Sequence, residues 1–372
     1  MMISKDLLPA FRDTLLGGSY NLLLGSGITL DSRNGHGELL RSAESLRHDL
    51  CKLTGAGDTT LLTRVYPLLS PQQIQRELVD RFSNCKPGLS VENMPHFLWR
   101  RLFTFNIDDV IENLYAPSGN KQKLVALNFD AEFEPTPDRT ELQAIHLHGW
   151  VQKPASGFVF SLNEYAQTMR AMNPWMHLLS EILATEPFII AGTSLNEIDL
   201  EYYLSHRNPA TPRRGRGPSL LIEPNPDVVT RKDCERFGLT LVSEKFGAFM
   251  QWLHQEFPSP PSVADLLVPD IAGLFSTGLS PNNLLRFFSD FELVVAADRP
   301  LFRTPSPFLY GREPQWIDLD QHVDIERQDN AIVQDRVTQS FTKKAPPRLV
   351  LLSDDPGTGK TTTIRRVAHT AH

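Results

Sequence analysis

Five short apolar runs, each followed at once by small or polar residues, constrain the fold of this chain more than any other feature. They are Asn21–Leu24, Leu102–Phe105, Ala144–Leu147, Phe188–Ala191 and Leu220–Ile222. Runs of this length and apolarity are typical of strands buried on both faces of a parallel sheet. Between them lie stretches with apolar residues at helical spacing, namely Glu38–Leu53, Gln72–Phe82, Trp175–Thr185 and Val228–Phe237. This alternation predicts an α/β fold with a doubly wound parallel sheet.

The domain organisation follows from where this alternation is interrupted. Residues from about 37 to 100 are predicted to be mostly helical, so we expect a helical insertion in a Rossmann-like domain over residues 1–256. The Pro- and Ser-rich stretch Phe257–Ser262 marks the end of this domain, and residues 257–304 are predicted to form a partly helical linker. Residues 305–372 are expected to form the start of a second domain. In sheets of this kind, ligands bind at the carboxyl ends of the strands.

The composition excludes several classes of protein. The 372 residues carry a formal net charge of -7, which gives no basic footprint for nucleic acid. The three cysteines are far apart and form no CxxC pair, so we expect neither a disulfide framework nor a zinc site. The sequence has no signal-peptide pattern and no apolar run of roughly 18–20 residues that could cross a bilayer. We therefore expect a cytoplasmic protein that binds neither a membrane nor nucleic acid.

Four motifs follow the predicted strands. They are Gly25-Ser26-Gly27-Ile28-Thr29, Thr104-Phe105-Asn106-Ile107-Asp108, Ile145-His146-Leu147-His148-Gly149 and Gly192-Thr193-Ser194-Leu195. Glycines after a strand let backbone N–H groups approach a phosphate. A tight turn explains Gly25 and Gly27 equally well, because Leu30 stands where the dinucleotide fingerprint has its third glycine. Asn106 and Asp108 could likewise serve only as caps of the following helix.

In this order and at these strand ends, the four motifs resemble the GAGxS, TxNxD, HG and GTS motifs of the sirtuin family, over roughly residues 15 to 255. The resemblance implies that the chain binds NAD. The residues that it assigns to cofactor binding are Gly25, Ser26, Gly27, Thr29, Asp108, Gly192, Thr193, Ser194, Glu223 and Asn225. It places the phosphates at the first glycine turn and the adenosine end at the last two residues. It makes His148 the catalytic base and puts Asn106 beside it in the nicotinamide–ribose pocket.

These residue types suit cleavage of the nicotinamide–ribose bond. Nicotinamide leaves a cationic ring as a neutral molecule, so the reaction needs no general acid and passes through an oxocarbenium-like transition state. Asn106 can position the ribose or a water molecule, and His148 can accept a proton near neutral pH. His146 would share a strand face with His148. Because only His148 precedes a glycine, as in the family's HG pair, His146 is interpreted as structural. Glu112 would share a helix face with Asp108 and is interpreted as a polar brace.

One departure from the family narrows the substrate. Protein-deacylating sirtuins carry a zinc ribbon of two CxxC pairs between the HG and GTS motifs, whereas this chain has no cysteine between His148 and Gly192. We therefore expect no zinc and an NAD glycohydrolase that releases nicotinamide and ADP-ribose, or a cyclic isomer. Zinc-free domains of this type resemble the NAD-depleting effectors of bacterial antiviral systems. Two alternatives stay open: a protein deacylase or ADP-ribosyltransferase, and a non-catalytic module that senses NAD or ADP-ribose.

A second nucleotide motif lies close to the carboxyl terminus. The predicted strand Arg348–Leu352 leads into Pro356-Gly357-Thr358-Gly359-Lys360-Thr361, which resembles a P-loop although Asp354 replaces its first glycine. In a P-loop, Gly357 and Gly359 would shape the phosphate cradle, Lys360 would contact the terminal phosphates of ATP, and Thr361 would hold Mg²⁺.

The sequence ends one predicted helix after this motif and before an acidic Walker B strand, so we expect a piece of a longer protein. A sirtuin-like effector joined to such a module resembles the STAND-type (Avs-type) antiphage proteins. The resemblance implies gating by an NTPase, a homo-oligomer of tetramer size or larger, and a phage protein as the trigger.

Overall fold

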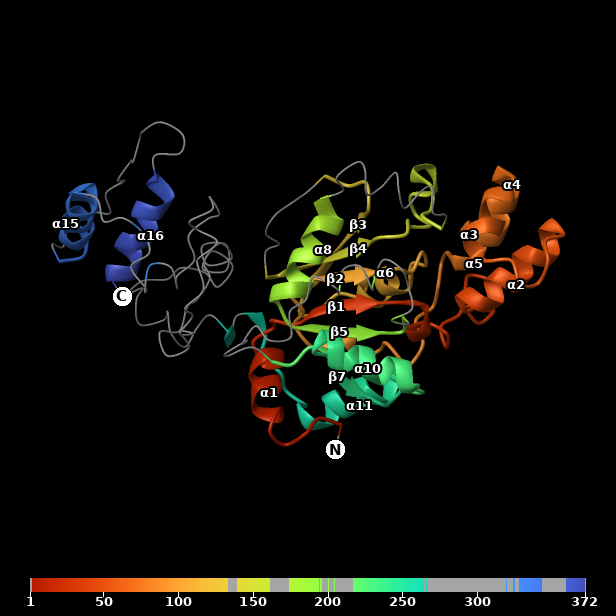
Figure 1. The fold of residues 1–372 in the computed structure, drawn as a ribbon, viewed down its shortest axis with the longest axis horizontal. Coiled ribbons are helices and arrows are strands. Elements are labelled where there is room, and N and C mark those ends of the chain that lie inside the picture. The colour runs from red at the N-terminus through yellow and green to blue at the C-terminus, as the bar shows by residue number, and fades with distance from the viewer. Residues whose placement is uncertain are drawn as a thin grey trace. The chain divides into compact units, whose positions relative to one another are not determined.

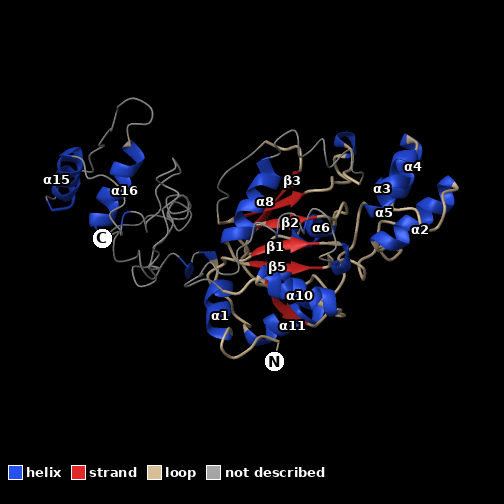
Figure 2. Cartoon of the chain, in the orientation of Figure 1, coloured by secondary structure: helices blue, strands red, loops and turns tan. Residues whose placement is uncertain are grey.

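The computed structural model describes residues 2–132, 139–160, 174–193, 195, 200, 204, 217–263, 265–266, 319, 324, 328–342 and 359–371. The chain divides into two compact units, Met1–Glu292 and Leu293–His372. The first unit contains a seven-stranded sheet in which every adjacent pair of strands is parallel (Figures 1 and 2). Its strands are β1 (Asn21–Leu24), β2 (Leu102–Thr104), β3 (Lys123–Asn128), β4 (Glu141–His146), β5 (Phe188–Ala191), β6 (Leu220–Ile222) and β7 (Thr240–Val242).

The strand order makes this sheet doubly wound. The order is β3-β4-β2-β1-β5-β6-β7: β2, β3 and β4 form the half on one side of β1, with β4 between β2 and β3, and the chain then crosses to the other side of β1 to add β5. The predicted α/β, Rossmann-like fold is confirmed. The order reverses between β1 and β5, and the crevice at such a switch point is where sheets of this type bind their ligands.

The five strands predicted before residue 256 are present, and this unit has two further strands that were not predicted. Strands β2 and β4 end one residue earlier than predicted, at Thr104 and His146, because the chain turns out of the sheet there. The unpredicted strands β3 and β7 lie at the two edges of the sheet. Strand β7 contains only two consecutive apolar residues, Leu241 and Val242, whereas β3 contains the apolar run Leu124–Leu127, which has the pattern of the central strands and was overlooked.

Helices cover both faces of the sheet because successive strand residues point to opposite sides. Leu22 and Leu24 belong to one buried cluster, and Leu23 belongs to the other. The first cluster packs against α1 (Leu8–Leu16), α6 (Val110–Tyr115) and α11 (Phe246–Glu256). The second packs against α8 (Pro174–Thr185) and α10 (Val228–Phe237). Helices α1 and α11 are not among the predicted elements, whereas α8 and α10 are.

The predicted helical insertion is present and lies on the side of the sheet to which the strands point, as the orange helices of Figure 1 show. Its elements are α2 (Ala43–Thr54), α3 (Leu62–Val65), η2 (Tyr66–Leu68), α4 (Pro71–Ile74), the π-helical turn η3 (Gln75–Val79) and α5 (Asp80–Phe82). Local sequence sets the helix ends. The Ser42 hydroxyl accepts the Ser45 amide proton at 3.2 Å, and Ser70 and Gln73 form a capping box at the start of α4.

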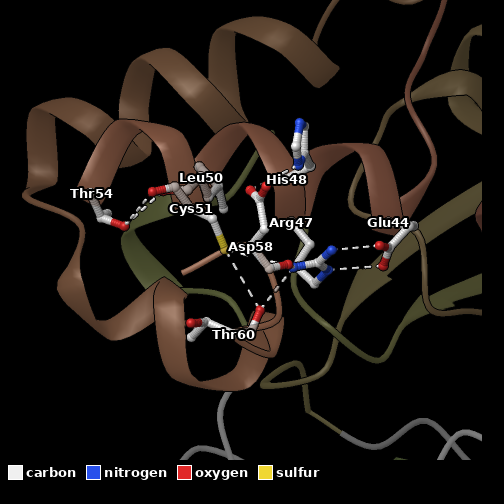
Figure 3. Close-up of polar contacts among 8 residues, drawn as sticks. All are labelled: Glu44, Arg47, His48, Leu50, Cys51, Thr54, Asp58 and Thr60. Carbon is white, nitrogen blue, oxygen red and sulfur yellow. Dashed lines mark hydrogen bonds and ion pairs between the residues drawn. The ribbon is translucent and has the colours of Figure 1, made fainter. Parts of the chain in front are cut away.

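Figure 3 shows how α2 is joined to the loop that follows it. The Arg47 guanidinium forms a two-pronged ion pair with Glu44, with N···O distances of 2.6 and 2.9 Å. Its third nitrogen donates to the main-chain carbonyls of Asp58 and Thr60, the latter at 3.1 Å. The Cys51 thiol lies 3.6 Å from the same Thr60 carbonyl. One side chain therefore links the helix to its own return loop.

Short one-turn helices complete the connections of the first unit: η1 (Ser26–Ile28), η4 (Met94–His96) and η5 (Pro154–Ser156). In the second unit the structure describes α15 (Gln328–Thr342) and α16 (Lys360–Ala371). A buried ion pair joins Arg366 of α16 to Asp324. The predicted strand Arg348–Leu352 and most of the predicted linker lie outside the described residues, so the domain boundaries at 256/257 and 304/305 stay predictions. Within the described segments, every helix is too short or too polar to cross a membrane.

Candidate functional site

The predicted site residues leave the sheet along one edge. The register pairs the last residues of all seven strands with one another, from Asn128 of β3 through His146, Thr104, Leu24, Ala191 and Ile222 to Val242 of β7. Gly25 and Gly192 are therefore each one residue beyond this row, and Asn106 and His148 are each two residues beyond it. The structure brings together residues that lie up to 167 positions apart in the sequence because parallel strands end at the same edge.

The glycines after β1 and β5 pack directly against each other. A Cβ atom on Gly25 would lie 2.5 Å from the Gly192 carbonyl oxygen, and one on Gly27 would lie 2.8 Å from the Gly192 Cα. Gly192 itself has a φ of 70°, and its own Cβ would lie 2.6 Å from the Gly25 oxygen. The Gly25 and Gly27 amides donate to Ala191 and Gly192 carbonyls at 2.9 and 2.8 Å. Close approach of two backbones, as a tight-turn interpretation requires, explains these three glycines.

Thr29, Asn106 and Asp108 form a buried polar group between the ends of β1 and β2. The Thr29 hydroxyl lies 3.3 Å from Asp108 Oδ2 and 3.5 Å from Asn106 Nδ2. All three residues are buried, with 1%, 5% and 4% of their surface exposed. Asn106 Oδ1 is buried and has no hydrogen-bond partner among the described residues. A buried amide oxygen of this kind marks a place where a polar group of a ligand or a water molecule fits.

The carboxyl group of Asp108 has two functions in this arrangement. Its Oδ1 accepts the amide proton of Val110, the first residue of α6, at 3.1 Å, although the N-cap position itself is occupied by Asp109. Its other oxygen faces Thr29. Burial raises the pKa of Asp108 to about 7, although the hydrogen bond from Val110 opposes the shift. The Asn106 side chain makes no capping contact within the described residues, so the capping alternative does not explain it.

His148 lies in the turn after β4, against aromatic side chains. Its ring is 4.7 Å from the ring of Phe105 and 6.3 Å from that of Phe160, measured between centroids. Only 6% of the residue is exposed. Gly149 must be glycine because its φ is 97° and a Cβ there would lie 2.6 Å from the Gly157 oxygen. The turn therefore packs the imidazole of His148 against the segment Phe158–Phe160.

His146 and His148 do not share surroundings, because β4 ends at His146. The His146 ring stacks on Trp150, and its two nitrogens face different acceptors. Nδ1 is 2.8 Å from the Asn106 carbonyl oxygen, and Nε2 is 2.7 Å from Glu112 Oε1. The sequence predicted a structural role for His146 and a bracing role for Glu112. In the structure the two side chains contact each other, and the His146 ring also contacts the backbone of Asn106.

The remaining predicted binding residues lie along the same edge with differing exposure. Thr193 is buried with 5% exposed, and its Cβ is among the atoms that a side chain at Gly25 would meet. Glu223 is half-buried, and its carboxylate accepts the Asn225 amide proton at 3.0 Å in an exposed turn after β6. Ser194 lies outside the described residues. Ser26 is half-buried, and within the described residues neither its amide nor its hydroxyl donates to another group.

The predicted P-loop is only partly described. Gly357 lies outside the described residues. Gly359 has a φ of 84° and directly precedes α16, in which Lys360 and Thr361 are the first two residues. Lys360 is half-buried and Thr361 is exposed. The backbone thus enters the helix through a conformation that favours glycine, and nucleotide binding at this motif stays a prediction.

Asp109 is a residue of this region to which the sequence drew no attention. Its carboxylate accepts the backbone amide protons of Asn84 and Cys85, both at 2.8 Å, and the Gln152 side chain at 2.8 Å. The Asp109 carboxylate therefore links the end of the helical insertion to the start of α6. The only feature of the sequence that could have pointed to Asp109 is that it is an acidic residue directly after Asp108.

No three His, Cys, Asp or Glu side chains of the described part of the chain are grouped as a metal site.

Comparisons with known proteins relate part of the chain to one domain family. Residues 100–245, less than half of the chain, match the family model of the SIR2-like domain. This segment contains Asn106, Asp108, His148 and Gly192. No curated protein matches the sequence. A solved structure from a study of the structural basis for the mechanism and regulation of Sir2 enzymes aligns with 69% of this chain and 98% of its own, at 10% identity and a TM-score of 0.38.

Proposed function

We propose that the carboxyl edge of the sheet binds NAD and that the chain hydrolyses its nicotinamide–ribose bond. The observation that carries the proposal is the buried Asn106 amide oxygen without a partner among the described residues, beside Thr29 and Asp108 and one strand away from His148. The match of residues 100–245 to the SIR2-like domain supports NAD as the ligand. A buried polar group left open in this way suits a ribose hydroxyl or a nicotinamide amide.

The chemistry requires few groups. When the C1′–N bond breaks, its electron pair returns to the pyridinium nitrogen, so nicotinamide leaves neutral without a proton. A water oxygen bonds to C1′, and the proton that this water loses passes to the His148 imidazole. Asn106 orients the water or the ribose. The products are nicotinamide, ADP-ribose and one proton; capture of C1′ by another group of the same molecule instead gives a cyclic isomer.

The pyrophosphate fits best at the switch point between β1 and β5. The Gly25 and Gly27 amides are already occupied by carbonyls of the β5 end, so the Ser26 amide and hydroxyl are the groups of this turn that a phosphate oxygen meets. Thr193 follows β5 at the same edge, and we assign Ser194 to the same part of the cofactor from its motif alone; Glu223 and Asn225, after β6, are assigned to the adenosine end. The glycines keep the floor of the crevice free of side chains.

Nicotinamide release tests this function directly. The chain is incubated with NAD, with and without ATP and Mg²⁺, and nicotinamide is measured chromatographically for wild type, His148→Ala and Asn106→Ala. Each substitution is expected to lower turnover by about 100-fold or more, since it removes a group that acts in the transition state. His36→Ala is the matched control, because His36 is exposed and is not one of the proposed site residues.

Binding measured by calorimetry separates the alternatives. NAD binding without nicotinamide release in any condition contradicts the hydrolase and favours a sensing module. Release that requires an acetylated peptide favours a deacylase, and transfer of label from NAD to protein favours an ADP-ribosyltransferase.

For the second unit, we propose that Gly357, Gly359, Lys360 and Thr361 bind ATP with Mg²⁺. The helix that begins at Lys360 directly after Gly359 supports this assignment. We also propose that nucleotide binding gates NAD cleavage in a cytoplasmic homo-oligomer that responds to a phage protein. Turnover that is independent of ATP, Mg²⁺ and protein concentration in a chain carrying both units contradicts the gating.

A further inference from the structure

A buried histidine joins a carboxylate to the main chain of Asn106. His146 is 1% exposed, its Nδ1 lies 2.8 Å from the Asn106 carbonyl oxygen, and its Nε2 lies 2.7 Å from Glu112 Oε1. The three groups come from three elements: the turn after β2, helix α6 and the end of β4. The contact spans 34 and 40 residues of sequence, so it forms only in the folded sheet.

The acceptors fix the protons on the imidazole. A carbonyl oxygen can only accept, so Nδ1 carries a proton that it donates to Asn106. The carboxylate of Glu112 can accept the proton of Nε2. Burial alone would lower the pKa of His146, but the charge of Glu112 and the hydrogen bonds to Glu112 and Asn106 outweigh it, and the pKa is raised. The ring therefore donates from both nitrogens.

The contact with His146 holds the carbonyl group of Asn106, and a hydrogen bond to Thr104 holds its amide group. The Thr104 hydroxyl accepts the Asn106 amide proton at 3.0 Å. With both peptide groups of Asn106 held, the direction of its Cα–Cβ bond, from which the side-chain amide extends, is fixed. The same fixed turn carries Asp108, whose carboxyl faces Thr29. Small displacements of a group that orients a reactant lower the rate of the reaction strongly.

We propose that His146 and Glu112 are positioning residues for NAD cleavage: they hold the Asn106 turn so that its side-chain amide meets the reacting ribose or water. The inference rests on the proposed function of Asn106 and His148. It assigns no proton transfer to either residue. The competing explanation is that His146 only fills space in the core, stacked on Trp150 at 5.3 Å.

Substitutions that keep shape but change hydrogen bonding distinguish the two explanations. His146→Phe keeps the stack on Trp150 and loses both donors. Glu112→Leu loses the acceptor, whereas Glu112→Gln keeps a polar partner for Nε2 and serves as the conservative rescue. The double variant Glu112→Leu/His146→Phe avoids a buried unpaired carboxylate, so it guards against unfolding of the single variant.

The expected result is a specific loss of kcat. His146→Phe, Glu112→Leu and the double variant should each lose about 10–100-fold in kcat with KM changed by less than about threefold, and Glu112→Gln should stay close to wild type. The double variant should lose no more than the worse single variant, because both act through Asn106. Folded variants with wild-type kcat overturn the proposal, as does an additive loss in the double variant.

A spectroscopic readout keeps this test independent of turnover. In protein labelled with ¹⁵N-asparagine, the Asn106 side-chain amide signal is identified by its absence in Asn106→Ala. It should move or broaden in His146→Phe and remain in place in Glu112→Gln. If wild type releases no nicotinamide, the proposed hydrolase fails while this signal still reports on positioning. An Asn106 signal unchanged in His146→Phe overturns the positioning role in either case.

Discussion

At the scale of single residues, the site consists of polar groups in a place where the fold would otherwise bury apolar ones. Asp108 is the clearest example, because burial raises its pKa to about 7 while Val110 and Thr29 supply hydrogen bonds. The carboxyl group therefore holds its proton to a higher pH than an exposed aspartate does. Such a group lowers the stability of the fold whenever it is ionised, which is a common property of side chains that bind or react.

The pH dependence of stability tests this account of Asp108. An acid whose pKa is raised by folding binds its proton more tightly in the folded state, so stability falls as pH rises from about 4 to about 7. Asp108→Asn lacks this titration. Its stability relative to wild type should therefore increase by about 1–3 kcal/mol between pH 5 and pH 8, measured by urea unfolding. A difference between the two proteins that does not change with pH contradicts the assigned burial.

Gly192 carries a separate prediction at the same scale. Alanine there meets the Gly25 oxygen at 2.6 Å and adopts a φ of 70°, so Gly192→Ala should destabilise the first unit by about 2 kcal/mol or more. Gly57→Ala is the control, because its nearest atom would be 3.8 Å away and its φ is not positive. Urea midpoints that are equal for the two variants would show that the two backbones do not need this close approach.

At the scale of elements, the carboxyl-terminal end of the helical insertion is hydrogen-bonded to Asp109, the residue after Asp108. Asp109 receives the amides of Asn84 and Cys85, and Asn84 adopts a φ of 55° that few residues other than glycine take. Tyr66 of η2 also contacts the ring of Phe160, which in turn lies against His148. The insertion therefore contributes to the walls of the site as well as to the core.

The stability of the insertion depends on the Arg47 contacts of Figure 3. Arg47→Met keeps the apolar stem but loses the hydrogen bonds to Glu44, Asp58 and Thr60, so we expect the melting temperature to fall by a few degrees. Arg41→Met is the matched control: Arg41 pairs with Asp49 but is 45% exposed, and exposed pairs contribute little. A larger loss for Arg41→Met than for Arg47→Met, measured by circular dichroism, contradicts this assignment.

At the scale of the whole molecule, the strand order decides where the site is. β1 and β5 are neighbours although 167 residues separate Leu24 from Ala191, and the order of the sheet reverses between them. The glycines after these strands meet at this reversal. Strand β2 ends beside β1, and β4 ends beside β2 in the same row, which adds Asn106 and His148. A doubly wound parallel sheet produces such a row because its strands all point the same way.

The amino-acid sequence by itself determined the central strands, the helical insertion and the edge at which the site residues gather. It could do so because buried parallel strands need continuous apolar runs and because small residues must follow them where backbones approach closely. Through its resemblance to the sirtuin motifs it predicted that Asn106, Asp108 and His148 belong to one site; the structure places all three at that edge, and their common function stays a prediction.

Only the tertiary structure decided what each of these side chains contacts. The edge strand β7 has only two consecutive apolar residues, too few to predict a strand, and the apolar run Leu124–Leu127 of β3 was not recognised as one. The close packing of Gly25 against Gly192, the anchoring of the insertion by Asp109 and the bridge from Glu112 through His146 to Asn106 join segments far apart in sequence. Local patterns contain no information on such contacts, because they depend on which strand ends the folded sheet makes neighbours.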